Sequence, residues 1–236
     1  MARLIVLFGE NMKTIKKIIP LMLCICIVML CGCNADSTDT DKTLVYGFEV
    51  PSAIDNGVTV EDIYLYSGEY VEDASFETCE NVVAIKVKNV SPTDIQLIRI
   101  KVVTSVKELM FEITTLNSGA TVIAFEKSKQ TLAEDEKINS IEVINRADFD
   151  SNVTLRESEF VVQANLSTIN IKNISSTEIQ NDIYVYYKKK DADGNYFGGI
   201  TFRTKAEGLK TDEIRQLPAA NFDPSDSEVL FVDYAE

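Results

Sequence analysis

The sequence has no histidine and no tryptophan among its 236 residues. The lack of histidine excludes Ser-His-Asp and Cys-His catalysis and any imidazole metal site. Basic residues are scarce, with 23 Lys and Arg against 37 Asp and Glu, a formal net charge of −14. A nucleic-acid partner needs a basic face, so this balance argues against one. The sequence also holds neither a metal-ligand cluster nor a Gly-x-Ser-x-Gly motif, and we expect no metal and no cofactor.

Long hydrophobic runs are missing as well. The apolar run at residues 18–30 is shorter than the roughly 20 residues that a membrane-spanning helix needs. Lys13, Lys16 and Lys17 precede the run, and Gly32 and Cys33 follow it closely. A basic start, a short apolar core and a small residue at the cut are the layout of a secretory signal.

The ending Leu30-Cys31-Gly32-Cys33 resembles the lipobox of bacterial lipoproteins. The resemblance implies that the Cys33 thiol receives diacylglycerol and that signal peptidase cuts between Gly32 and Cys33. The chain would then be lipid-anchored in the cell membrane on its extracytoplasmic face. An uncleaved N-terminal anchor with an accidental cysteine is the alternative interpretation.

The start of translation is predicted to be Met12. Residues 1–11 place Glu10 and an extra apolar stretch ahead of the lysines, which spoils the basic start of the signal. We therefore interpret residues 1–11 as a mis-annotated extension, residues 12–32 as the lipoprotein signal peptide and residues 33–42 as the lipidated cysteine with a polar, flexible tether. Cleavage would remove four cations and one anion, so the mature chain would be still more acidic.

Cysteine is scarce in the predicted mature chain. Cys24, Cys26 and Cys31 would leave with the signal, and Cys33 would be acylated, which leaves Cys79. One free thiol cannot form an internal disulfide, so packing must hold the fold. We expect Cys79 to be a small packed hydrophobe.

Beyond the tether the sequence is dominated by period-two alternation. Ile63 and Leu65 share one face of a predicted strand, and Val83, Ile85 and Val87 share one face of another. Such segments of five to eight residues, spaced by turn-forming residues, predict an all-β sandwich. The best helical candidate, residues 131–137, is short. We predict two tandem β-sandwich domains, at residues 43–146 and 147–236.

An internal repeat supports the tandem arrangement. Residues 85–96 align without gaps on residues 169–180, with seven of twelve positions identical. The alignment continues with a slip of one residue, and residues 111–119 then match residues 200–208 in length. In the shared turn we expect Asn89 and Asn173 to adopt left-handed φ or to bond nearby backbone.

The second repeat resembles the immunoglobulin-like modules of an uncharacterised family of surface lipoproteins from Gram-positive, often anaerobic bacteria. The matching segments are Asn173-Ile-Ser175, Tyr186-Tyr-Lys188, Asp193-Gly194, residues 198–202 and Gly208-Leu209. The first repeat departs from this pattern, since its hairpin at residues 104–107 is short and lacks Asp-Gly. The resemblance implies immunoglobulin-like sandwiches on the cell surface and implies no activity.

Four tyrosines form the candidate binding surface. Tyr64, Tyr66, Tyr184 and Tyr186 alternate with inward aliphatic residues, so their rings should face outward. Exposed tyrosines can stack on sugars or anchor a protein partner, and they are also good strand residues.

Charged segments give weaker signals. Residues 191–195 carry Asp and Asn, but the spacing does not fit an EF-hand and favours a hairpin turn. The acidic pairs at residues 134–136 and 157–159 are interpreted as a loop and a solvated strand face rather than an acid–base pair. The run Lys188–Lys190 is interpreted as the solvated end of a hairpin.

Three functions fit the sequence. The first is a lipid-anchored, non-enzymatic interaction or structural module on the cell surface, with an unknown protein or glycan partner. The alternative is a carbohydrate- or ligand-binding lipoprotein that uses the outward tyrosines. A carboxylate-based hydrolase has the least support, because no residue cluster is arranged for catalysis.

Overall fold

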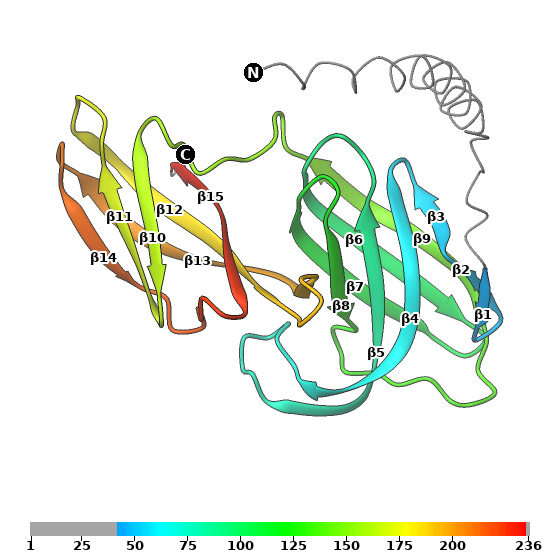
Figure 1. Ribbon diagram of the computed structural model, residues 1–236. Helices are drawn as coiled ribbons and strands as arrows, with labels where there is room; N and C mark the ends of the chain where they lie inside the picture. Colours follow the sequence, from blue (N-terminus) through cyan, green and yellow to red (C-terminus); the bar gives the residue numbers. More distant parts are fainter. Residues whose placement is uncertain (1–41, 235–236) are drawn as a thin grey trace, which may run out of the picture. The chain divides into compact units, whose positions relative to one another are not determined.

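The computed structural model describes residues 42–234, and every regular element in this part of the chain is a β-strand (Figure 1). The predicted all-β class is therefore confirmed. The strands are β1 Thr43–Val45, β2 Phe48–Val50, β3 Ser52–Asp55, β4 Val58–Glu69, β5 Thr78–Asn89, β6 Ile95–Thr104, β7 Glu108–Leu116, β8 Thr121–Phe125, β9 Ile138–Asp148, β10 Phe160–Asn165, β11 Thr168–Asn173, β12 Ile179–Lys190, β13 Tyr196–Leu209, β14 Ile214–Pro218 and β15 Ser227–Tyr234.

The internal repeat is visible in the strand pairing. In the first repeat β5 pairs with β4 and β8, and β6 pairs with β7 and β9. In the second repeat β11 pairs with β10 and β14, and β12 pairs with β13 and β15. The two repeats, β4–β9 and β10–β15, thus have the same six-strand topology. The division into domains at residues 146 and 147 stays a prediction.

The repeats share one sheet. β13 of the second repeat pairs in parallel with β8 of the first, through Tyr196 beside Val122 and Phe197 beside Ile123. This pairing creates a seven-stranded sheet in the order β15-β12-β13-β8-β5-β4-β3. The chain from Lys42 onward forms one compact unit.

Alternating Val, Ile and Phe side chains build the cores. A strand directs successive side chains to opposite faces, so a period-two sequence buries one row. Ile85 and Val87 of β5, with Ile98 and Ile100 of β6, are fully buried in the core of the first repeat. Ile169, Ile171, Ile183 and Val185 are their counterparts in the second. A third, aromatic cluster contains Tyr70, Val71, Cys79, Val82, Ala84, Ile123 and Phe125. Cys79 is buried in it, as expected for a packed hydrophobe.

The shared turn is held by a buried asparagine in each repeat. The Asn89 amide donates to the carbonyls of Thr93 and Leu116 at 2.9 and 3.0 Å, and its oxygen accepts from Ser91. Asn173 makes the same bonds to Thr177 and Leu209 at 2.9 and 3.1 Å. Neither asparagine has a positive φ. Hydrogen bonding therefore explains these residues, and left-handed geometry does not.

Two expectations, one for the match between the repeats and one for residues 131–137, are wrong. The structural partner of Leu116 is Leu209, so the turn at Gly119 corresponds to Asp212 and not to Gly208. The Gly119 N–H donates to the Asn89 carbonyl at 2.8 Å and the Asp212 N–H donates to the Asn173 carbonyl at 2.9 Å, which identifies the match. Both residues have positive φ, and the positive φ of Gly208, 52°, matches that of Thr115, 50°. The helical candidate at residues 131–137 forms turns and irregular chain, with no helix.

Substitution of Asn89 tests the role of the buried amide. We expect Asn89→Ala to lower the free energy of unfolding by about 2–3 kcal/mol, because two buried carbonyls lose their donor. Asn145→Ala, at an exposed position of β9, should change it by less than about 0.5 kcal/mol. Urea unfolding measures both values, and equal effects of the two variants would contradict the assignment.

Candidate functional site

Tyr64 and Tyr66 lie on β4, on the face opposite Ile63, but their rings are not free. Tyr66 lies 4.6 Å from Phe125 and 5.7 Å from Phe197, centroid to centroid. Both tyrosines pack, partly buried, against the aromatic cluster. Burial raises the pKa of Tyr64 to about 12, and the nearby negative charges of Asp62 and Asp191 add to the shift.

Tyr184 and Tyr186 lie on β12. The Tyr186 ring is parallel to that of Phe231 at 4.2 Å and packs against the core of the first repeat. The Tyr184 ring has the Arg203 guanidinium 4.7 Å from its centroid. The two pairs of tyrosines thus pack against different clusters, and the binding surface that they were expected to form stays a prediction.

The acidic segments are used for structure. The Asp191 carboxylate accepts hydrogen bonds from Asp193 and Asn195 and closes the β12–β13 hairpin. Glu136 lies in a loop, as expected, but it is buried and accepts from Thr104 and Ala133 while Lys107 lies 3.2 Å away. No group of acidic or cysteine side chains in residues 42–234 is arranged to hold a metal ion.

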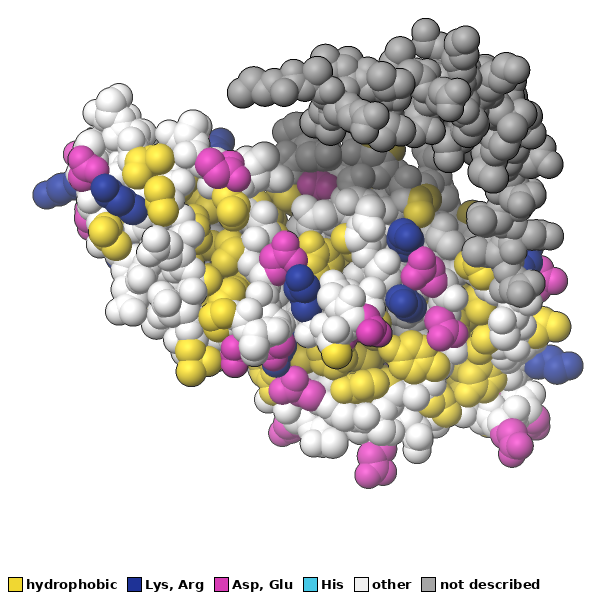
Figure 2. All heavy atoms as spheres, in the orientation of Figure 1, with side chains coloured by type: hydrophobic (Ala, Val, Ile, Leu, Met, Phe, Trp, Pro, Cys, Tyr) yellow, Lys and Arg dark blue, Asp and Glu magenta, His cyan; other side chains and the backbone are white. Residues whose placement is uncertain are grey.

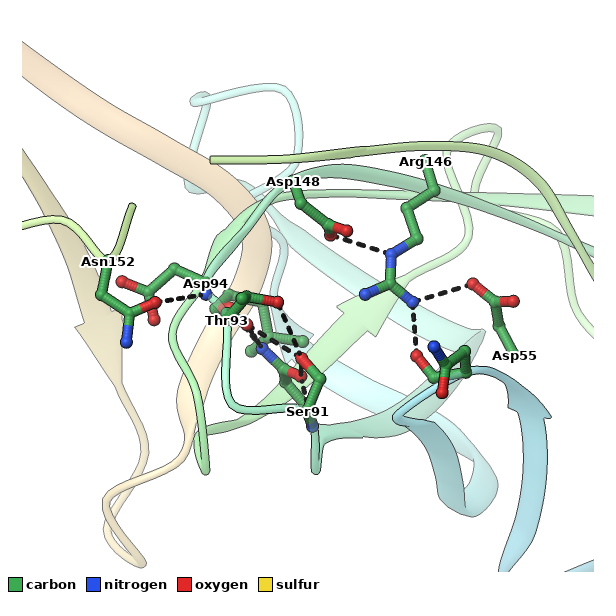
Figure 3. Close-up of polar contacts among 10 residues, drawn as sticks. Asp55, Ser91, Thr93, Asp94, Arg146, Asp148 and Asn152 are labelled. Carbon is green, nitrogen blue, oxygen red and sulfur yellow. Dashed lines mark hydrogen bonds and ion pairs between the residues drawn. The ribbon is translucent and has the colours of Figure 1, made fainter. Parts of the chain in front are cut away.

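The segment between the repeats is tied down by Asp94 and Asn152 (Figure 3). The Asn152 side chain accepts from the Asp94 N–H at 3.0 Å, and the Asp94 carboxylate accepts from the Val153 N–H at 2.8 Å. Nearby, Arg146 donates to Asp55 and Asp148 at 2.9 and 2.8 Å. The connection after β9 therefore follows a fixed path along the first repeat.

Lys188 is the largest departure from the sequence analysis. The expectation that it solvates a hairpin end is wrong, since the side chain is fully buried. Its Nζ donates to the carbonyls of Gly198, Gly199 and Ile200 at 3.3, 2.8 and 2.9 Å. These three acceptors match the three protons of an ammonium group. Lys189 and Lys190 instead make ion pairs at the surface.

Glu72 meets the same peptide units from the first repeat. Its carboxylate accepts from the N–H groups of Gly199 and Phe125 at 2.8 and 2.9 Å and from Ile200 at 3.2 Å. Burial raises the pKa of Glu72, and these hydrogen bonds and Lys188 oppose the shift. Burial lowers the pKa of Lys188, and the charge of Glu72 opposes that shift. The two groups compensate each other across the backbone of β13.

Two glycines allow this contact. A Cβ at Gly199 would lie 2.0 Å from the Glu112 carbonyl oxygen, and one at Gly198 would lie 2.2 Å from the Val71 side chain. Gly198 also has a φ of +91°, which L residues rarely adopt. The Gly-Gly pair and the length of the β12–β13 hairpin were the only signals of this junction in the sequence.

Two open depressions lie elsewhere on residues 42–234. One, of about 660 Å³, is lined by residues that include Tyr46, Leu65, Glu80 and Asn81. The other, of about 480 Å³, lies between the Glu178 turn and the end of β13. Neither holds a buried polar group free to react.

The surface in view carries mixed charge. Figure 2 shows acidic and basic side chains interspersed on one face, with no gathering of basic residues there. Within residues 42–234 no helix is long and apolar enough to cross a membrane. Cys33 and the Gly32–Cys33 cleavage site lie outside the described residues.

Comparison with known proteins gives no relative. No family model matches the sequence, and no curated protein or solved structure matches it either. Functional interpretation therefore depends on the residues and their geometry.

Titration of tyrosine tests the accessibility of Tyr64. The folded chain should keep the Tyr64 proton between pH about 10 and about 12, while the unfolded chain loses it. The free energy of unfolding should therefore fall as the pH rises through this window. Ultraviolet difference titration of the protein against Tyr64→Phe measures the step, and a Tyr64 step near pH 10 would show an exposed ring.

Substitution of Lys188 tests the junction. Lys188→Met leaves three carbonyls without a donor and Glu72 without its cation, so we expect a loss of about 3–5 kcal/mol. Lys190→Met, which removes a partly exposed ion pair with Glu228, should cost less than about 1 kcal/mol.

Urea unfolding compares these variants with Glu72→Gln and with the double variant. The double variant should lose less than the sum of the single losses, because the two groups compensate each other. Additive losses, or equal losses in the two lysine variants, would rule out a coupled pair.

Proposed function

We propose that this chain is a lipid-anchored, extracytoplasmic surface protein that acts as a non-enzymatic interaction or structural module. The observation that carries the proposal is the segment Leu30-Cys31-Gly32-Cys33 at the end of a short apolar run with a basic start. A polar stretch follows and leads into an all-β body. That order suits a folded domain displayed from a membrane on a tether.

The use of charged groups supports a non-enzymatic role. Glu126 and Glu136 are buried, and each accepts hydrogen bonds from nearby backbone N–H groups. Asp94 holds the connection between the repeats, and Glu72 holds β13. Each of these carboxylates has a structural partner, whereas a general acid or base must face a substrate. A hydrolase receives the least support from this arrangement.

The alternative, a carbohydrate-binding lipoprotein, receives limited support. The Tyr66 ring packs at a tilt against Phe125 and the Tyr186 ring stacks on Phe231, so less of their surface is free for a sugar. A glycan array with the protein and its Tyr184→Ala variant separates the two functions. Binding that Tyr184→Ala abolishes would favour the alternative.

Acylation of Cys33 tests the anchor. In cells that express the gene, radiolabelled palmitate should enter the protein, and Cys33→Ala should abolish the label and release the chain from the membrane fraction. Cys31→Ala is the matched control, because it removes a thiol that the predicted cleavage discards. Unchanged membrane binding of Cys33→Ala, with no label in either protein, would refute the proposal.

A further inference from the structure

β10 is a sheet edge with no protection. Within residues 42–234 it pairs with β11 alone, and its six residues, Phe160–Asn165, include no charged residue and no proline. The other strands that end the larger sheets are β3, β7, β9, β14 and β15, and each contains a charged residue. Charges and proline on edge strands prevent pairing with other chains. Their absence from β10 leaves it open to such pairing.

The free edge presents unpaired backbone groups. Asn173 directs its N–H to Glu213 and its carbonyl to Asp212, so both groups point away from β10. Because antiparallel pairing alternates, Val162 and Ala164 then direct their backbone groups away from β11. Residues 42–234 supply no backbone partner for either N–H.

In the first repeat, the edge equivalent to the free edge of β10 is covered by another strand. There β3 pairs antiparallel with the equivalent strand β4, through Ser52 beside Val60 and Asp55 beside Val58. Ile54 of β3 packs against the core, and Val58 and Val60 are fully buried. In the part of the chain that the structure describes, no strand takes the place of β3 in the second repeat.

The core of the second repeat is incompletely covered as a result. Val162 corresponds to Val60, because Phe160 faces Asn173 as Val58 faces Asn89. Val60 is fully buried, whereas Val162 and Ala164 are only partly buried against their core. Apolar surface and unpaired backbone therefore lie along the same edge.

We propose that the free edge of β10 binds an extended segment of a partner protein by antiparallel strand addition, in the manner of β3 on β4. This proposal deepens the proposed interaction function by naming its surface, and it does not require the lipid anchor. Main-chain hydrogen bonds would hold the segment, and alternate side chains would select it. Following Ile54, the segment carries an aliphatic residue that covers Val162.

Charge favours a different protein over a second copy of this chain. The chain has a formal net charge of −14, and Glu157 and Glu159 lie just before β10. Two copies paired along β10 would bring two strongly acidic chains into contact, and like charges repel. A neutral or basic extended segment meets no such repulsion.

Peptide display tests the proposal on the full-length protein in detergent micelles. A random octapeptide library on phage is the probe. We expect the enriched peptides to carry aliphatic residues at alternate positions. They should bind at least about tenfold more weakly to Ala164→Pro, which removes one free N–H. Val161→Lys, which places a charge on the edge while its backbone stays paired with Lys172, should weaken binding similarly.

Gln216→Lys is the matched control. It adds the same charge at an exposed position of β14 and should leave peptide binding unchanged. The thermal midpoint of each variant confirms that it is folded. Failure to enrich peptides would overturn the proposal, and so would folded Ala164→Pro and Val161→Lys variants that bind the peptides as tightly as the unsubstituted chain. A dimer that Ala164→Pro dissociates would also overturn it, since the occupant would then be a second copy.

The Cys33→Ala variant keeps the two proposals separate. It should bind the enriched peptides as the unsubstituted chain does, because β10 lies far along the sequence from the anchor. Loss of the palmitate label with peptide binding intact would confirm both proposals. Peptide binding without any label in the unsubstituted chain would support the edge and contradict the anchor.

Discussion

The joint between the repeats depends on two opposite charges, the buried Lys188 ammonium and the partly buried Glu72 carboxylate, that make no direct contact with each other. The Lys188 ammonium holds the carbonyls of Gly198, Gly199 and Ile200, and the Glu72 carboxylate holds N–H groups of the same strand segment. A buried charge is costly unless it is paired and hydrogen-bonded, and here each group meets both conditions through the backbone of β13. The segment is thereby fixed against both repeats, and β13 can add to the sheet of the first repeat at β8.

This joint gives the proposed surface module a defined geometry. A chain of separate domains on flexible connections would present its surfaces in many relative orientations. Here a shared sheet, the Glu72–Lys188 pair and the fixed path of the connection at Asp94 oppose such freedom. If the chain has the proposed lipid anchor and tether, a body of defined geometry would hold the proposed binding edge of β10 in a constant position relative to the other surfaces of the module.

The sequence was informative where the physics is local. Alternation of Val and Ile identified the strands, because a two-residue period buries one row regardless of the neighbouring strand. The repeat located the turn at Asn89 and Asn173, although the reason is a buried amide rather than left-handed backbone. The match of Gly119 with Gly208 failed, because the residue that donates to the turn asparagine's carbonyl in the second repeat, as Gly119 does in the first, is Asp212. Aligning glycine with glycine was therefore a poor guide to the equivalent turn, because Asp can adopt the positive φ of Gly119.

The junction could not be predicted because its partners are far apart in the sequence. Three successive lysines look solvated, and only the fold reveals that Lys188 points inward while its neighbours do not. Glu72 accepts a hydrogen bond from Gly199, which lies 127 residues later in the sequence. The tyrosines were placed on the correct face of their strands, but the sequence does not show that Phe125 and Phe231 occupy the space beside them.

The asymmetry of the joint also restricts how such a gene can change. The long β4–β5 connection that carries Glu72 belongs to the first repeat alone, since β10 and β11 are joined by the short turn at residues 166 and 167. The extended hairpin that carries Lys188 belongs to the second repeat alone. Recombination that moved or deleted one repeat alone would leave Lys188 or Glu72 without its oppositely charged partner. It would also expose Phe125, which Phe197 of the second repeat covers. The heritable module is therefore the pair, and we expect evolution to copy or lose both halves together.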